Sequence, residues 1–123
     1  MPNALPGMRI LIVEDEYYLA ADLADELRAR GAEVLGPVGG FDQAMAAIDA
    51  GGIDRVILDM NLRGEMSFPI AAKLDEAGIP YLIATGYSSG ILPAQFAGKP
   101  RIEKPFRPER VAEMLLSEFD TAG

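Results

Sequence analysis

The chain has 123 residues, half of them hydrophobic, which fits one globular domain with a buried core. Its formal net charge of −8 at pH 7 argues against a nucleic-acid-binding surface and against docking on an anionic membrane. Because cysteine and histidine are both absent, disulfides, thiolate metal sites, cysteine nucleophiles and Ser-His-Asp triads are excluded.

The sequence shows no recognisable signal peptide and no membrane span. The first residues lack the basic start and apolar run of a signal peptide, and no stretch approaches the roughly 18 apolar residues of a membrane span. We therefore expect a cytoplasmic protein with a short tail at residues 1–7, one domain at residues 8–120 and a second tail at residues 121–123.

Short apolar runs alternate with amphipathic segments, and this pattern predicts strands alternating with helices. In chain order we expect a strand at 8–13, a helix at 16–30, a strand at 33–36, a helix at 41–50, a strand at 55–58, a loop through residue 64, a helix at 68–77 and a strand at 80–84. Residues 88–97 predict only a short or irregular helix, because Gly90 and Pro93 interrupt it. A weak strand at 101–103 and a helix at 108–119 complete the pattern.

The first predicted helix has a clear inward face. Its leucines and alanines recur at helical spacing, which predicts that they face the core: Leu19, Ala20, Leu23, Ala24 and Leu27. We expect the adjacent Tyr17 and Tyr18 to divide, with one ring in the core and one at the surface.

Five strands alternating with helices imply a parallel sheet that is covered by helices on both faces. Ligands in such folds bind at the carboxyl ends of the strands. The residues that follow four of the predicted strands are polar or small, and they are Glu14 and Asp15, then Asp59, then Thr85 and Gly86, and finally Lys104. Three carboxylates, one hydroxyl and one ammonium are therefore expected to converge on one edge of the sheet.

Carboxylates that lie close together repel, and a hard cation with oxygen ligands relieves the repulsion, which indicates Mg²⁺. Phosphoryl transfer depends on positioning and on stabilising spread negative charge. Asp59 is the candidate nucleophile and would form an acyl phosphate. Mg²⁺ and Lys104 would neutralise phosphoryl oxygens, and the Thr85 hydroxyl would donate to another oxygen.

Four segments carry a resemblance to a known family: IVEDE at residues 12–16, ILDMN at 57–61, ATG at 84–86 and EKPF at 103–106. In this order and spacing they resemble the receiver domain of two-component response regulators, over residues 8–119. The resemblance implies a flavodoxin-like (βα)5 three-layer sandwich with a parallel five-stranded sheet of order 2-1-3-4-5. It also implies a cis peptide bond between Lys104 and Pro105.

The resemblance implies roles for the site residues as well. Asp15, Asp59 and the backbone carbonyl of Asn61 would bind Mg²⁺, and Glu14 would reach the metal through water. The phosphoryl group would come from a phosphohistidine on a sensor histidine kinase or a phosphotransfer protein.

The stretch PYLIATGY at residues 80–87 is similar to the FATGUY subgroup of receivers, whose members are often single-domain regulators. Where the family usually has a switch aromatic, three residues before Lys104, this chain has Arg101. We therefore expect the switch to involve Thr85, Tyr87 and Arg101.

The predicted function is a stand-alone receiver in phosphorelay signal transduction, which catalyses its own phosphorylation and dephosphorylation and signals by partner binding or phosphorelay to a downstream protein. Two alternatives stay open. An aspartyl phosphohydrolase would need a second carboxylate two residues after Asp59, where this chain has Asn61. A degenerate receiver would act only as a scaffold, although the phosphorylation residues are all present. Taken alone, Glu14 and Asp15 also fit an ordinary strand-to-helix turn.

Overall fold

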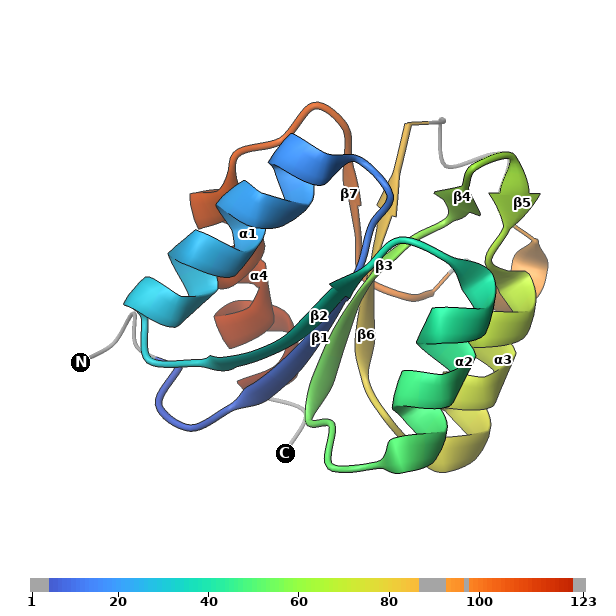
Figure 1. Ribbon diagram of the computed structural model, residues 1–123, viewed down its shortest axis with the longest axis horizontal. Coiled ribbons are helices and arrows are strands. Elements are labelled where there is room, and N and C mark those ends of the chain that lie inside the picture. Colours follow the sequence, from blue (N-terminus) through green and yellow to red (C-terminus); the bar gives the residue numbers. More distant parts are fainter. Residues whose placement is uncertain (1–4, 87–92, 97, 121–123) are drawn as a thin grey trace.

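The structure is a computed structural model that describes residues 5–86, 93–96 and 98–120, and side chains as far as residue 117. Helices and strands alternate in the expected order (Figure 1). Their bounds are β1 (Arg9–Val13), α1 (Tyr17–Ala29), β2 (Glu33–Val38), α2 (Phe41–Ala50), β3 (Arg55–Asp59), β4 (Asn61–Leu62), β5 (Glu65–Met66), α3 (Phe68–Ala77), β6 (Tyr81–Thr85), the 3-10 turn η2 (Ala94–Phe96), β7 (Arg101–Glu103) and α4 (Pro108–Asp120).

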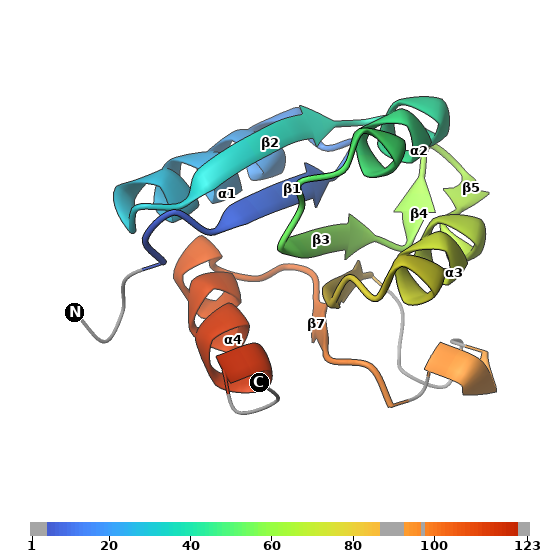
Figure 2. The same ribbon diagram turned by 90° about the horizontal axis from the view of Figure 1, so that it is seen from below.

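The main sheet has five parallel strands in the order β2-β1-β3-β6-β7. This is the expected order 2-1-3-4-5, because β4 and β5 form a separate two-stranded sheet and shift only the numbering. Helices α1 and α4 cover one face of the sheet, and α2 and α3 cover the other (Figures 1 and 2). The predicted flavodoxin-like sandwich is therefore confirmed.

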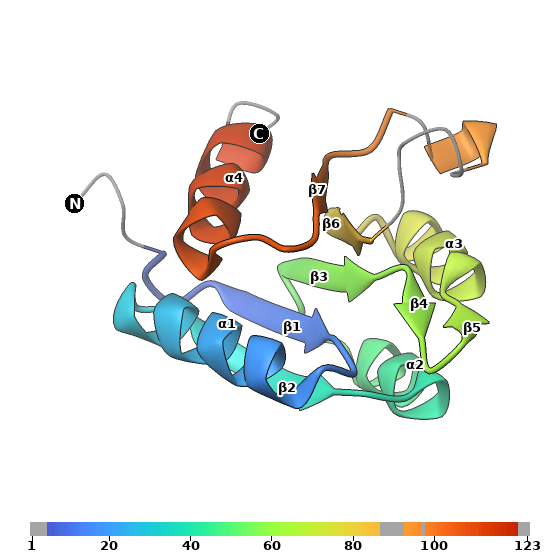
Figure 3. The same ribbon diagram turned by 90° about the horizontal axis from the view of Figure 1, so that it is seen from above.

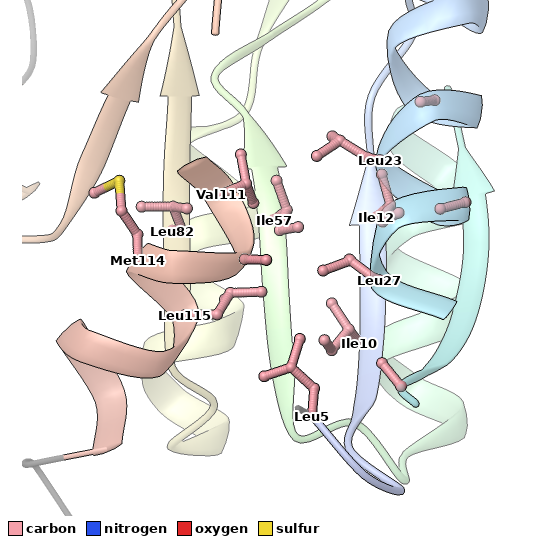
Figure 4. Close-up of a cluster of buried hydrophobic side chains, with 14 residues drawn as sticks. Leu5, Ile10, Ile12, Leu23, Leu27, Ile57, Leu82, Val111, Met114 and Leu115 are labelled. Carbon is pink, nitrogen blue, oxygen red and sulfur yellow. The ribbon is translucent and has the colours of Figure 1, made fainter. Parts of the chain in front are cut away.

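Alternation along the strands divides the core between the two faces of the sheet. Ile10 and Ile12 of β1 and Ile57 of β3 pack against α1 and α4 (Figure 4). Leu11 and Leu58 lie on the opposite face, against α2 and α3. Because helices cover both faces, β1 is apolar and buried over residues 10–13 and β3 over residues 56–58, as the sequence runs predicted.

Helix α1 packs through the expected stripe, in which Ala20, Leu23 and Ala24 are buried. The prediction for the two tyrosines was wrong, because Tyr17 and Tyr18 are both exposed. They occupy the first turn of α1, one turn before the buried stripe begins, and their rings pack edge to face on each other with centroids 5.3 Å apart.

The expected loop after Asp59 is instead a short antiparallel hairpin, β4–β5, which lies beyond the tip of β3 (Figure 3). Its two central residues, Arg63 and Gly64, have φ angles of 53° and 86°, the left-handed values of a type I′ turn. Leu62 is buried, and this anchors the hairpin to the core shared with α2 and α3.

Two further segments, the predicted irregular helix at residues 88–97 and the predicted tail at residues 1–7, contain more structure to report. Of the expected irregular helix at residues 88–97, the described part contains the short 3-10 turn η2, and residues 87–92 and 97 lie outside the described residues. Near the N-terminus Leu5 is fully buried among α1 and α4 residues, and its N–H donates to the carbonyl of Arg30 at 2.7 Å.

Within the described ranges no helix has the length and apolar character needed to cross a membrane.

Candidate functional site

The carboxylates predicted to converge do so at the carboxyl edge of the main sheet. Glu14 and Asp15 follow β1, and Asp59 is the last residue of the neighbouring strand β3. Each offers one carboxylate oxygen, and these atoms all lie within 4.8 Å of one another. Glu14 and Asp59 are buried and Asp15 is half-buried, so the cluster is partly withdrawn from solvent.

Lys104, which follows β7, provides the positive charge of the cluster. Its ammonium Nζ lies 2.9 Å from Asp59 Oδ2, 3.0 Å from Glu14 Oε1 and 2.9 Å from Glu16 Oε1. The peptide bond between Lys104 and Pro105 is cis, as the family resemblance implied.

Burial and hydrogen bonds shift the pKa values of Glu14, Asp15, Asp59 and Lys104. Burial raises the pKa of Glu14 to about 8, and it also raises the pKa of Asp59, although the Asn61 N–H and the Lys104 ammonium oppose it there. Burial favours a higher pKa for Asp15 too, but its hydrogen bonds, first of them from the Arg63 N–H, outweigh burial and lower the pKa. Burial likewise disfavours the charged Lys104, yet its carboxylate partners outweigh that effect and raise its pKa.

Thr85 lies at the same edge as the carboxylates. Asp59 pairs in register with Ala84, so Thr85 is one residue beyond that pair, and its side chain is buried. The Lys104 N–H donates to the Thr85 carbonyl at 2.8 Å, which joins the two strand ends. A Cβ added at Gly86 would meet no atom within 4 Å, so this position leaves open space beside the site.

The predicted switch residues are only partly described. Arg101 begins β7, pairs in register with Ile83 and is half-exposed. Tyr87 lies outside the described residues. The switch therefore stays a prediction.

Three contributors to the site were missed by the sequence analysis. Glu16 accepts a hydrogen bond from Lys104, and its signal was the third acidic residue of the triplet at 14–16. Ser67 is fully buried, and its Oγ donates to the Asp59 carbonyl at 2.7 Å. The Arg63 N–H donates to Asp15 Oδ2 at 2.8 Å. No local sequence pattern predicts the Ser67 and Arg63 hydrogen bonds, since both depend on how the hairpin folds.

Comparison with solved structures identifies the family. The chain is similar to SdrG from Sphingomonas melonis Fr1, a response regulator receiver domain, at 41% identity and a TM-score of 0.78, over 89% of this chain and 93% of that one. This chain belongs to the response regulator receiver family. The BeF3-activated conformation of SdrG from Pseudomonas melonis Fr1 also matches this receiver, with 39% identity and a TM-score of 0.75 over 90% of this chain and 96% of that one.

Curated sequences give a second line of similarity. The transcriptional regulatory protein TcrA of Mycobacterium tuberculosis is 41% identical over 68 residues, which are 55% of this receiver. The receiver matches only 26% of the length of TcrA. No family model matches the chain.

Proposed function

We propose that this receiver accepts a phosphoryl group on Asp59, in a Mg²⁺-dependent reaction, from the phosphohistidine of a sensor histidine kinase or phosphotransfer protein. The modified receiver then signals by binding a downstream protein or by passing the phosphoryl group on. The observation that carries the proposal is the juxtaposition at Asp59, whose Oδ2 lies 2.9 Å from Lys104 Nζ within a cluster of carboxylates from two strand ends.

The donor set fits Mg²⁺, which prefers oxygen ligands and is commonly held by one or two carboxylates together with water. Asp15 and Asp59 would bind the ion directly through carboxylates, with the Asn61 carbonyl as a further ligand and Glu14 acting through water. The electrostatics support a cation as well, because one ammonium faces several carboxylates and the pKa of Glu14 is raised to about 8. When bound, Mg²⁺ supplies positive charge that offsets the charge on phosphoryl oxygens.

The chain's own residues account for the remaining requirements of the transfer. An Asp59 carboxylate oxygen attacks phosphorus, the new P–O bond forms as the P–N bond to the donor imidazole breaks, and the electron pair of that bond leaves with the imidazole. Lys104 holds Asp59 oriented and stays protonated, so its charge is available to a phosphoryl oxygen. Thr85 offers a hydroxyl from the adjacent strand end.

The proposal is tested with a small phosphodonor. Incubation with acetyl phosphate and Mg²⁺ should add one phosphoryl group per chain, measured by intact mass, and should fail in EDTA. Asp59→Asn should abolish the addition, whereas Asp22→Asn, a control for loss of one exposed acid on α1, should leave it unchanged. Beryllofluoride should shift the NMR signals of backbone amides around Asp59, since the related SdrG has a BeF3-activated conformation.

Two outcomes would contradict the proposal. Phosphoryl addition that persists in Asp59→Asn would assign the acceptor to another residue. Turnover of many phosphate esters per chain would support the phosphohydrolase alternative instead.

A further inference from the structure

The β4–β5 hairpin connects the two carboxylates that are proposed to share the metal ion. At its start the Asn61 N–H donates to Asp59 Oδ1 at 3.0 Å, and at its tip the Arg63 N–H donates to Asp15 Oδ2 at 2.8 Å. Asp59 and Asp15 belong to different strands, so one short segment holds both of them by backbone donors.

The tip of the hairpin requires a backbone conformation that most residues avoid. Arg63 has a φ of 53°, and it is the only residue other than glycine with a positive φ in the described ranges. Gly64 follows with a φ of 86°. The Gly64 N–H donates to the Asn61 side-chain oxygen Oδ1 at 2.8 Å, so the Asn61 amide closes the turn from inside the hairpin.

We propose that the Asn61 side chain is a positioning residue for the metal ligand Asp15: it holds the turn that presents the Arg63 N–H to that carboxylate. This inference rests on the proposed Mg²⁺ site. It assigns the side chain a task separate from the carbonyl, which is itself a proposed ligand. It follows that Mg²⁺ affinity depends on turn residues whose side chains do not touch the ion, as is common for groups that orient metal ligands.

Gly64→Ala is the sharpest variant, because it disturbs the turn only through backbone conformation. A Cβ at Gly64 would meet no atom within 4 Å, and the strain comes from the positive φ alone. Gly78→Ala is a matched control: Gly78 ends α3 with a φ of 71°, and a Cβ there also meets no atom within 4 Å. Both variants should lower the melting temperature to a similar extent.

Two measurements separate a positioning role from a structural one. The first is the Mg²⁺ dissociation constant from calorimetry, which should rise by about tenfold in Gly64→Ala and Asn61→Ala and stay unchanged in Gly78→Ala. The second is hydrogen exchange of the Arg63 amide in metal-free protein, which should accelerate in the same two variants.

The outcomes distinguish this inference from the proposed function. If Gly64→Ala loses stability as Gly78→Ala does, with Mg²⁺ affinity and Arg63 exchange unchanged, the turn is only structural and the inference is overturned. If the unmodified receiver binds no Mg²⁺, the metal site itself is overturned, and this inference with it.

Discussion

Removing the Lys104 ammonium should destabilise the metal-free protein by about 3 kcal/mol at pH 7. In Lys104→Met the buried Asp59 loses the cation 2.9 Å from its Oδ2, and its side chain is only 5% exposed. Glu14, whose pKa is raised to about 8, is largely protonated at this pH and adds little to the cost. The loss is limited to about 4 kcal/mol, because Asp59 can instead take up a proton against its ordinary pKa of 3.8.

Thermal unfolding followed by circular dichroism in EDTA measures this effect. For a chain of 123 residues, 3 kcal/mol corresponds to a fall in melting temperature of about 10 °C. Saturating Mg²⁺ should reduce the deficit, since a bound cation takes over part of the neutralisation. Lys73→Met is the matched control: its ammonium pairs with Asp49, whose side chain is 68% exposed, so the loss should stay below about 1 kcal/mol. If Lys104→Met unfolds at the same temperature as Lys73→Met, the argument from buried charge is refuted.

Three further predictions concern stability. In EDTA the free energy of unfolding should fall as the pH rises from about 5 to about 8, by up to about 1.4 kcal/mol per pH unit. The reason is that folding raises the pKa of Glu14 from 4.5 to about 8, so the unfolded chain releases this proton at a lower pH than the folded chain. Urea titrations at several pH values measure this slope, and Glu14→Gln should flatten it. Leu5→Ala should cost about 2–4 kcal/mol in urea unfolding, because the side chain is fully buried, and a loss below 1 kcal/mol would contradict its packing in the core. Ser67→Ala should cost about 1 kcal/mol by removing the buried hydrogen bond to the Asp59 carbonyl, and an unchanged urea midpoint would argue against that bond.

Much of the fold could be predicted because the sequence marks both the inside and the ends of its elements. The bounds predicted for α2 and α3 agree with the structure, since glycines end both helices and apolar residues recur within them. The convergence of Glu14, Asp59 and Lys104 followed from one topological rule, that parallel strands bring their carboxyl ends to a common edge.

The features that were missed depend on contacts between distant residues. Strands of two residues have no periodicity, so the hairpin could be inferred only from its turn, and Arg63 is an unusual residue for a left-handed position. Prolines and a glycine lie on either side of Leu5, and this composition is typical of a tail. In the structure, however, the Leu5 side chain is buried in the core cluster that α1 and α4 share. In the sequence Glu16 looks like any solvent-exposed glutamate, and its role at the site becomes visible only from its ion pair with Lys104 in the structure.

The carboxylates around Lys104 also affect its reactivity toward labelling reagents. The neutral form of a lysine amine attacks acylating reagents, and this side chain is 16% exposed with a raised pKa, so little neutral amine is available. The sequence contains three lysines, and among the described residues each of the other two pairs with one aspartate, Lys73 with Asp49 and Lys99 with Asp75. Labelling should therefore reach Lys73 and Lys99 first, and the rate at Lys104 becomes a direct chemical reporter of whether the acidic cluster is intact.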